Sequence, residues 1–170
     1  AEINRKDDLE ADNRAYTVVR EEGQKRVLLV TDDNMFLEKA VMNIPWVDLY
    51  KTSQLSAVGK SEEYDLYIFD GKLPETLPEQ GNILYVNPGS WGDIVQAETL
   101  SNVSVAFTDT ELTRYIAGDS FGVTAGKAYE RPIWADGFLT SGSSCLGYYG
   151  ETAGRRVAVL GFDIHQSDLA

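Results

Sequence analysis

Short apolar runs alternate with polar connectors over residues 26–89. The first run, residues 27–30, contains only valine and leucine. An unbroken run of this kind is typical of a strand covered on both faces, as in a parallel sheet. Similar runs predict further strands at residues 47–50, 64–70 and 82–86, each followed by turn-forming residues.

One helix is predicted between the first two of these strands. Apolar residues recur at helical spacing over residues 35–44, the polar residues just before them offer an N-cap, and Pro45 ends the segment. A strand, a helix and further strands joined by short connectors favour right-handed crossovers. The expected fold class is therefore α/β, with a mostly parallel open sheet.

The last third of the chain is richer in glycine. Residues 146–150 and 156–162 form two strand-like runs on either side of a loop that contains Gly154. This pattern predicts a C-terminal antiparallel hairpin. Ser167 or Asp168 would then cap a final helix, which we expect to be truncated in this chain.

Two segments are predicted. Residues 1–24 are rich in charge and contain one short strand-like run, at 15–19, so they have too few apolar residues for a core of their own. We interpret them as the terminal strand of an upstream β-domain followed by a linker. Residues 25–170 would form the sheet domain.

Composition excludes several classes of function. The chain has 15 basic and 27 acidic residues, a formal net charge of −12, so a nucleic-acid partner is not expected. Cys145 and His165 are the only cysteine and the only histidine, which excludes a disulfide framework, multi-cysteine zinc sites and multi-histidine metal clusters. No apolar run is long enough to span a membrane. We predict no cofactor, no metal and no membrane contact by this chain itself.

The candidate chemistry lies where predicted strands end, because ligands of open α/β sheets bind beyond the carboxyl ends of the strands. The residues at these ends are Asp32, Asp33, Asp70, Asn87 and His165. The three aspartates are similar to the acidic set of a Mg²⁺-dependent phospho-receiver, although no lysine follows the next strand candidate, residues 103–107. The alternative is that these aspartates cap a helix and shape turns.

Nucleophilic catalysis is not predicted. The turn after residue 86 reads Asn87-Pro88-Gly89-Ser90, so it has no cysteine, and Ser90 lacks the Gly-x-Ser-x-Gly pattern. Cys145 lies in a glycine-rich segment and is interpreted as a buried structural thiol. We therefore expect no enzyme activity, and at most a vestigial or ligand pocket formed by Asp33, Asp70, Asn87, Ser90 and His165.

Two further features stay open. A sugar or other small ligand at the strand ends is a third alternative, with no sequence feature in its favour. Trp46, Trp91 and Trp134 fall in connectors, where core packing and interface contacts are both possible.

Several segments together carry a family resemblance. They are residues 11–16, 26–31, 34–40, 44–50, 64–74, 83–88 and 154–169. This set resembles the class I glutamine-amidotransferase-like domain, with a flavodoxin-like sheet, that follows the von Willebrand factor A domain in bacterial membrane-anchored proteins of the aerotolerance type. The resemblance is weakest over residues 90–135.

The resemblance implies a non-catalytic accessory domain. Its partner would be another protein or the neighbouring domains of the same chain. The whole protein would be held at the bacterial cell membrane, on its extracytoplasmic side, by helices outside residues 1–170.

Overall fold

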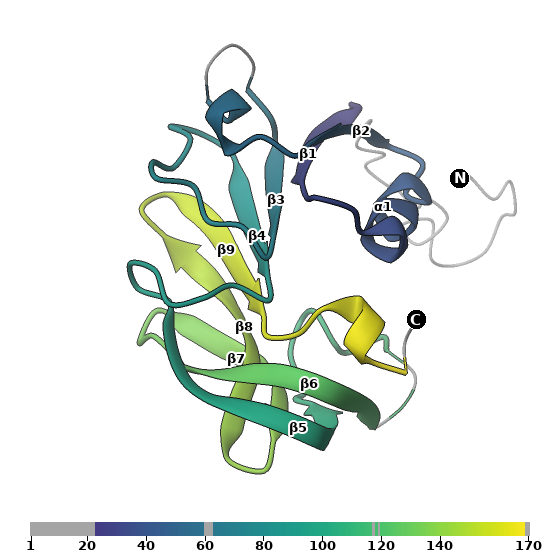
Figure 1. The fold of residues 1–170 in the computed structure, drawn as a ribbon, viewed down its shortest axis with the longest axis vertical. Helices are drawn as coiled ribbons and strands as arrows, with labels where there is room; N and C mark the ends of the chain where they lie inside the picture. Colours follow the sequence, from purple (N-terminus) through teal and green to yellow (C-terminus); the bar gives the residue numbers. More distant parts are fainter. Residues whose placement is uncertain (1–22, 60–62, 117, 119, 169–170) are drawn as a thin grey trace, which may run out of the picture.

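Nine strands of the described chain form one sheet, in the order β2-β1-β3-β4-β9-β8-β6-β5-β7 (Figure 1). This computed structural model describes residues 23–59, 63–116, 118 and 120–168, so the segment interpreted as an upstream strand lies almost wholly outside the described residues. The elements are β1 (Lys25–Val30), α1 (Met35–Met42), β2 (Val47–Thr52), η1 (Leu55–Ala57), β3 (Leu66–Asp70), β4 (Asn82–Val86), β5 (Val95–Phe107), β6 (Ser120–Glu130), β7 (Ala135–Ser141), β8 (Ser144–Thr152), β9 (Arg155–Leu160) and η2 (Ile164–Gln166).

The strands β1, β2, β3, β4 and β9 pair in parallel, and we call them the parallel half. Their positions agree with the runs predicted from the sequence. Helix α1 also begins where predicted, because the Asn34 side chain accepts a hydrogen bond from the backbone N–H of Leu37 at 3.1 Å and so caps the first turn. No helix in the described ranges is long and apolar enough to cross a membrane.

The strands β5, β6, β7 and β8 are antiparallel and form a closed ring, which we call the barrel half. Strand β6 pairs with β5 and β8, and β7 pairs with both β5 and β8, so the ring has no open edge. It lies below the parallel half in Figure 1. Closure of a sheet in this way removes the exposed strand edges of an open sheet.

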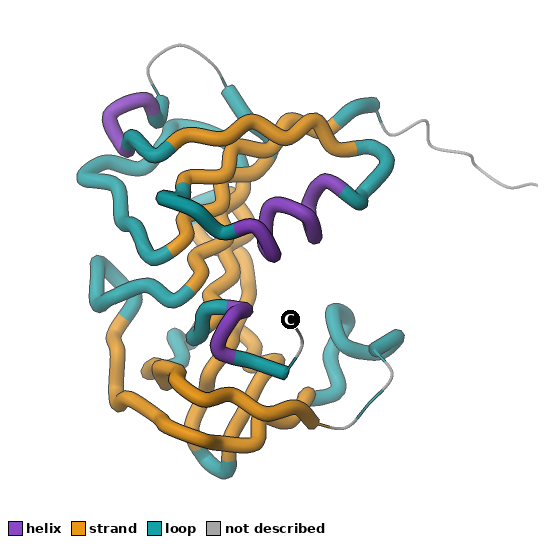
Figure 2. The backbone as a smooth tube through the Cα atoms, turned by 45° about the vertical axis from the view of Figure 1, so that its right-hand side comes forward, coloured by secondary structure: helices purple, strands orange, loops and turns teal. Residues whose placement is uncertain are grey.

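The predicted fold class, an α/β protein with a mostly parallel open sheet of the amidotransferase-like or flavodoxin-like type, is wrong. The longest strands are the antiparallel β5 and β6, of 13 and 11 residues, and the sheet closes on itself. Among the described residues there is one α-helix, and Figure 2 shows strands and loops making up most of the backbone. The β3–β4 connector, residues 71–81, contains two prolines and two glycines, which oppose a crossover helix there.

The predicted C-terminal hairpin is confirmed. Strands β8 and β9 pair antiparallel from Gly147↔Leu160 to Thr152↔Arg155. The two loop residues, Ala153 and Gly154, have φ of 49° and 74°, the left-handed pair that a tight two-residue hairpin needs.

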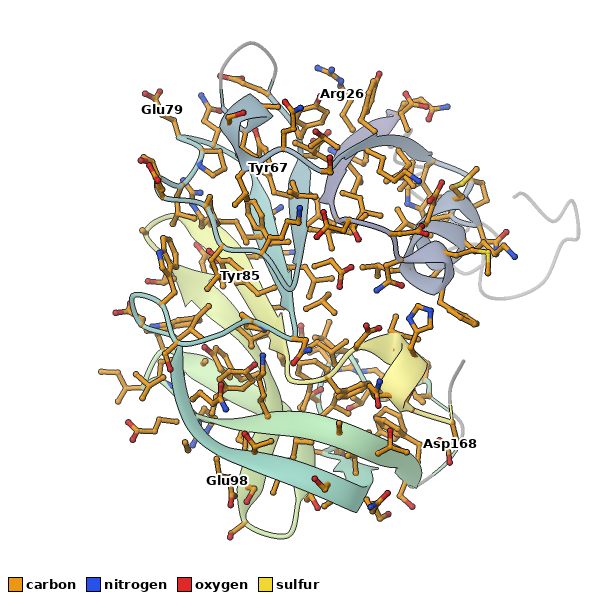
Figure 3. The ribbon with its side chains drawn as sticks, in the orientation of Figure 1. Arg26, Tyr67, Glu79, Tyr85, Glu98 and Asp168 are labelled. Carbon is orange, nitrogen blue, oxygen red and sulfur yellow. The ribbon has the colours of Figure 1, made fainter. Side chains whose placement is uncertain are left out.

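Apolar side chains alternate between the two faces of the parallel half. One face packs Val27, Leu29 and Ile68 against Leu37 and Val41 of α1. The opposite face is an aromatic layer, which is covered by loops and the short 3₁₀ helix η1 and not by an α-helix. Its rings include Tyr67, Phe69 and Tyr85, and Figure 3 shows Tyr67 and Tyr85 on the side of β3 and β4 away from α1. A third cluster, built around Val105, Val123 and Leu146, fills the barrel half.

Gly161, just after β9, joins the two halves through its backbone. Its N–H donates to the carbonyl of Leu146 at 2.7 Å, and its carbonyl accepts from the N–H of Lys127 at 2.6 Å. A Cβ at this position would lie 2.1 Å from the Lys127 oxygen and 2.7 Å from the Leu146 oxygen. Only glycine therefore allows the barrel strands to approach this closely.

We expect Gly161→Ala to lower the free energy of unfolding by about 1–3 kcal/mol, because the new methyl group meets fixed backbone rather than a movable side chain. Gly89→Ala is the matched control, since nothing lies within 4 Å of its Cβ position. Urea denaturation followed by circular dichroism measures both. Equal stability of the two variants would contradict this role of Gly161.

Candidate functional site

Two of the three aspartates at the strand ends make structural contacts. The Asp70 carboxylate, at the end of β3, accepts a hydrogen bond from the Thr31 hydroxyl at 2.6 Å. Asp32 forms an ion pair with Lys72 at 2.6 Å, while Asp33 is exposed. In the described part of the chain, no group of three or more acidic, histidine or cysteine side chains could hold a metal ion. The receiver alternative therefore gains no support from this geometry.

The turn after β4 is fixed by side chains of the barrel half. The carbonyls of Asn87 and Pro88 accept hydrogen bonds from Lys127 Nζ at 2.8 and 3.1 Å, and the Tyr129 hydroxyl donates to the Pro88 carbonyl at 2.9 Å. Burial lowers the pKa of Lys127. Asn87 itself adopts a φ of 49°. Two strand-end carbonyls are thus occupied by β6.

Ser90 also has a local role. Its hydroxyl oxygen accepts a hydrogen bond from the backbone N–H of Gln96 at 3.1 Å, which links the turn to the start of β5. Among hydrogen bonds between described residues, none connects Ser90 to His165.

His165 lies in η2 and pairs with the residue that caps that helix. The imidazole Nδ1 is 3.0 Å from Asp163 Oδ1, and the same oxygen accepts from the His165 backbone N–H and from Asn34 Nδ2. The ring of Phe36 packs edge-on at a centroid distance of 4.5 Å. The structure therefore brings His165 to Asp163 and Asn34, and not to Asp33, Asp70 or Asn87 through any hydrogen bond between described residues.

A cavity of about 340 Å³ lies instead on the aromatic face of the sheet, and we call it the aromatic pocket. It is lined by Leu77, Ile83, Tyr85, Trp91, Gly92, Asp93, Ile94, Trp134, Tyr148, Thr152, Ala153, Arg155 and Val157. Both halves of the molecule contribute, since β4 and β9 belong to the parallel half and β8 to the barrel half. Its size falls within the range of small-molecule sites, about 300–1,000 Å³.

Sheet register places two of the aromatic rings in this pocket. Tyr85 of β4 is opposite Val159 of β9, and Val159 is opposite Tyr148 of β8, so the three form one cross-strand row. Side chains in one row point to the same face of a sheet. The two tyrosines therefore share the aromatic face although they come from different halves of the chain.

The two tryptophans come from connectors. Trp91 pairs with Ile94 through two backbone hydrogen bonds of 2.9 Å, and its ring lies 6.2 Å from that of Tyr85. Trp134 precedes β7 and packs edge-on against Tyr148 at 6.0 Å. A Cβ on Gly150 would lie 2.5 Å from the Trp134 carbonyl oxygen and 2.9 Å from its ring, so glycine at this place in β8 makes room for the indole.

Two buried polar atoms in side chains that line the pocket have no hydrogen-bond partner among the described residues. They are the Tyr148 hydroxyl and Arg155 Nη1. The other terminal nitrogen of the Arg155 guanidinium, Nη2, donates to the Glu79 carbonyl at 2.7 Å. Unpaired buried polar atoms are uncommon because each costs about 1–3 kcal/mol. Both residues line the aromatic pocket, and Arg155 also lines a second cavity, beside Glu63 and Gln80.

Both tyrosines of the pocket stay neutral near pH 7. Burial raises the pKa of Tyr85 to about 12, partly offset by the positive charge of Arg155. Burial also raises the pKa of Tyr148, and the charges of Cys145, Asp93 and Tyr85 add to the effect. Each phenol therefore keeps its proton and can donate a hydrogen bond to a ligand.

The sequence pattern draws attention to the tryptophans of this site, but it does not show where they lie in the fold. It does not decide between core packing and interface contact for Trp91 and Trp134, and it predicts Tyr85 and Tyr148 only as strand residues. The signals that point to the pocket are the Gly150 contact and the cross-strand register, and both require the pairing of strands that are distant in sequence.

Tyr148 and Tyr129 form a matched pair for a stability test. Tyr148 and Tyr129 are 0% and 3% exposed, and of their two hydroxyls only that of Tyr129 has a hydrogen-bond partner among the described residues. We expect Tyr129→Phe to lower the free energy of unfolding by about 1–2 kcal/mol, because it removes a buried hydrogen bond. Tyr148→Phe should leave it unchanged or raise it by up to about 1 kcal/mol, since no bond is lost.

Urea denaturation of the ligand-free protein measures both variants under the same conditions. A loss of stability in Tyr148→Phe as large as that in Tyr129→Phe would show that the Tyr148 hydroxyl has a partner in the folded protein.

Comparison with known proteins finds similar folds but no family. The sequence matches no protein-family model and has no significant match among curated proteins. A cytoplasmic protein of Salmonella typhimurium aligns with a TM-score of 0.61 at 10% identity, over 82% of this chain and 87% of its own. A GMP synthase-like protein of Thermoplasma acidophilum gives 0.52 at 13% identity, over 85% and 87%. An exo-β-1,4-mannosidase of Opitutaceae bacterium strain TAV5 gives 0.53 at 13% identity, over 87% of this chain and 32% of the enzyme. At these identities the likeness concerns the fold alone.

Proposed function

We propose that this chain is a non-catalytic accessory domain that acts by binding. Its targets would be a ligand, a protein partner or the neighbouring domains of the same protein. The observation that carries the proposal is that the side chains best suited to nucleophilic chemistry are each held by a structural contact, whereas the unpaired buried polar atoms of the described residues line a pocket.

Three side chains could take part in nucleophilic catalysis, and each forms a structural hydrogen bond. The Ser90 hydroxyl accepts from Gln96, and the His165 imidazole bonds to Asp163. Cys145 donates a hydrogen bond from its thiol to the Gly147 carbonyl at 3.4 Å, and burial raises its pKa. A nucleophilic serine or cysteine needs a base within hydrogen-bond reach or a lowered pKa. Among the described residues, no hydrogen bond joins Ser90 or Cys145 to a histidine or a carboxylate.

The distribution of the fold supports an accessory role. The fold makes up most of the Salmonella chain but 32% of the mannosidase, so it occurs both nearly alone and as one part of a larger protein. The sequence resemblance gives the proposed context, a bacterial protein with a von Willebrand factor A domain. In that proposal, helices outside residues 1–170 anchor the protein in the membrane and this domain lies on the extracytoplasmic side.

A labelling experiment tests the absence of an activated serine. We expect incubation with a fluorophosphonate probe to leave the intact mass unchanged, because no described residue forms a hydrogen bond to Ser90 that could deprotonate it. Ser104, an exposed serine of β5, is the internal reference, and Ser104→Ala is the matched control for Ser90→Ala. Ammonia release from glutamine, measured in parallel, should not exceed that of buffer.

Covalent labelling that disappears in both Ser90→Ala and His165→Ala, but persists in Ser104→Ala, would establish a working nucleophile and base. Such a result would overturn the non-catalytic role.

A further inference from the structure

We propose that the aromatic pocket binds one neutral sugar ring in its pyranose form. This inference rests on the proposed function, because it names the ligand of a domain that binds without converting. It follows from three properties of the pocket: aromatic faces, a small number of polar groups that include both donors and an acceptor, and a limited volume.

The aromatic faces suit one side of a pyranose. The axial C–H groups of a sugar ring form an apolar patch, and their partial positive charge is attracted to the negative face of an aromatic ring. Trp91 and Trp134 line the cavity together with Tyr85 and Tyr148. Both tryptophans are partly buried, so their rings are fixed by packing and also face the cavity.

The polar groups suit the hydroxyls on the rim of the same ring. Among the described residues, the Tyr148 hydroxyl and Arg155 Nη1 are buried donors without acceptors, and the exposed Asp93 carboxylate, which also belongs to the lining, can only accept. A sugar hydroxyl both donates and accepts, so the hydroxyls of one ring can pair with donors as well as with a carboxylate. Binding would thus remove the penalty of two unpaired buried atoms.

Other ligand classes fit less well. A hydrocarbon would leave the Tyr148 hydroxyl and Arg155 Nη1 unpaired. A carboxylate or phosphate would satisfy the donors, but it would meet the negative Asp93 and a chain of formal net charge −12. A neutral polyol with one apolar face meets neither objection.

The volume limits the length of the ligand. At about 340 Å³ the pocket is close to the lower end of the range for small-molecule sites, about 300–1,000 Å³. The hairpin residues Thr152 and Ala153 close one side. The geometry therefore favours a single ring or the terminal ring of a longer sugar.

The test is a titration of the 170-residue chain with methyl pyranosides of glucose, galactose, mannose and N-acetylglucosamine. Intrinsic tryptophan fluorescence reports binding, because two of the three tryptophans line the pocket. We expect at least one glycoside to give a saturable change. Trp134→Ala should weaken that binding by about tenfold or more, since a stacking face is lost.

Two further variants make the test specific. Tyr148→Phe should weaken binding by about fivefold through loss of one hydrogen bond, without the loss of stability that could confuse the result for Trp134→Ala. Trp46→Ala is the control, because Trp46 is 51% exposed and does not line the pocket, so its removal should leave the affinity unchanged.

The outcomes separate this inference from the proposed function. No saturable change with any of the four glycosides, or binding that Tyr148→Phe and Trp134→Ala both leave unaltered, would overturn the sugar site and leave the non-catalytic role intact. Proton NMR of the sugar after prolonged incubation tests whether a bound glycoside is cleaved. A glycoside that binds as expected but is cleaved would support the site and overturn the non-catalytic role.

Discussion

The pairing of β8 with β9 is the contact on which the rest of the molecule depends. Strand β9 is the last strand of the parallel half, and β8 is the first strand of the barrel half, so these two strands hold both halves in one sheet. Their register also determines which side chains share a face. Because Tyr148 lies opposite Val159, and Val159 opposite Tyr85, a pocket built from both halves follows from this one alignment. A shift of one residue would send Tyr148 to the other face.

The parts of the fold that could be predicted from the sequence are those specified by neighbouring residues. The valine and leucine run of β1, the Asn34 cap and the two-residue turn of the hairpin all depend on contacts within a few positions. In the barrel half, the sequence predicts strands only at residues 146–150, within β8, and as a candidate at 103–107, within β5. The burial of β5 alternates irregularly, and most of its 13 residues are exposed or half-buried, so its sequence resembles a polar connector. The parallel pattern of residues 25–86 therefore gives no information about β5, β6, β7 and β8, which pair antiparallel.

For the candidate site too, the sequence predicts the positions of residues along the chain but not the partners of their side chains. Asp32, Asp70 and His165 do lie after strands or at a helix start, as predicted, but their side chains bond to Lys72, Thr31 and Asp163. Which partner a polar residue finds depends on segments that are distant in the chain. The rule that ligands bind at the carboxyl ends of parallel strands assumes that those ends are open. Here η2 packs beside one end, and side chains of β6 occupy the carbonyls of another.

Lys127 and Tyr129 show why the pocket lies on a face of the sheet and not at its end. Both side chains donate to the carbonyl of Pro88, so the strand end that an open sheet would offer to a ligand is filled by the barrel half. The same packing orients the Tyr129 ring edge-on against Tyr148 at 6.3 Å. The Tyr129 hydroxyl thus bonds to the backbone, whereas the Tyr148 hydroxyl has no hydrogen-bond partner among the described residues. Phenylalanine at position 148 would fill nearly the same space without an unpaired hydroxyl, so in the proposed sugar site the function of this hydroxyl is to pair with the ligand.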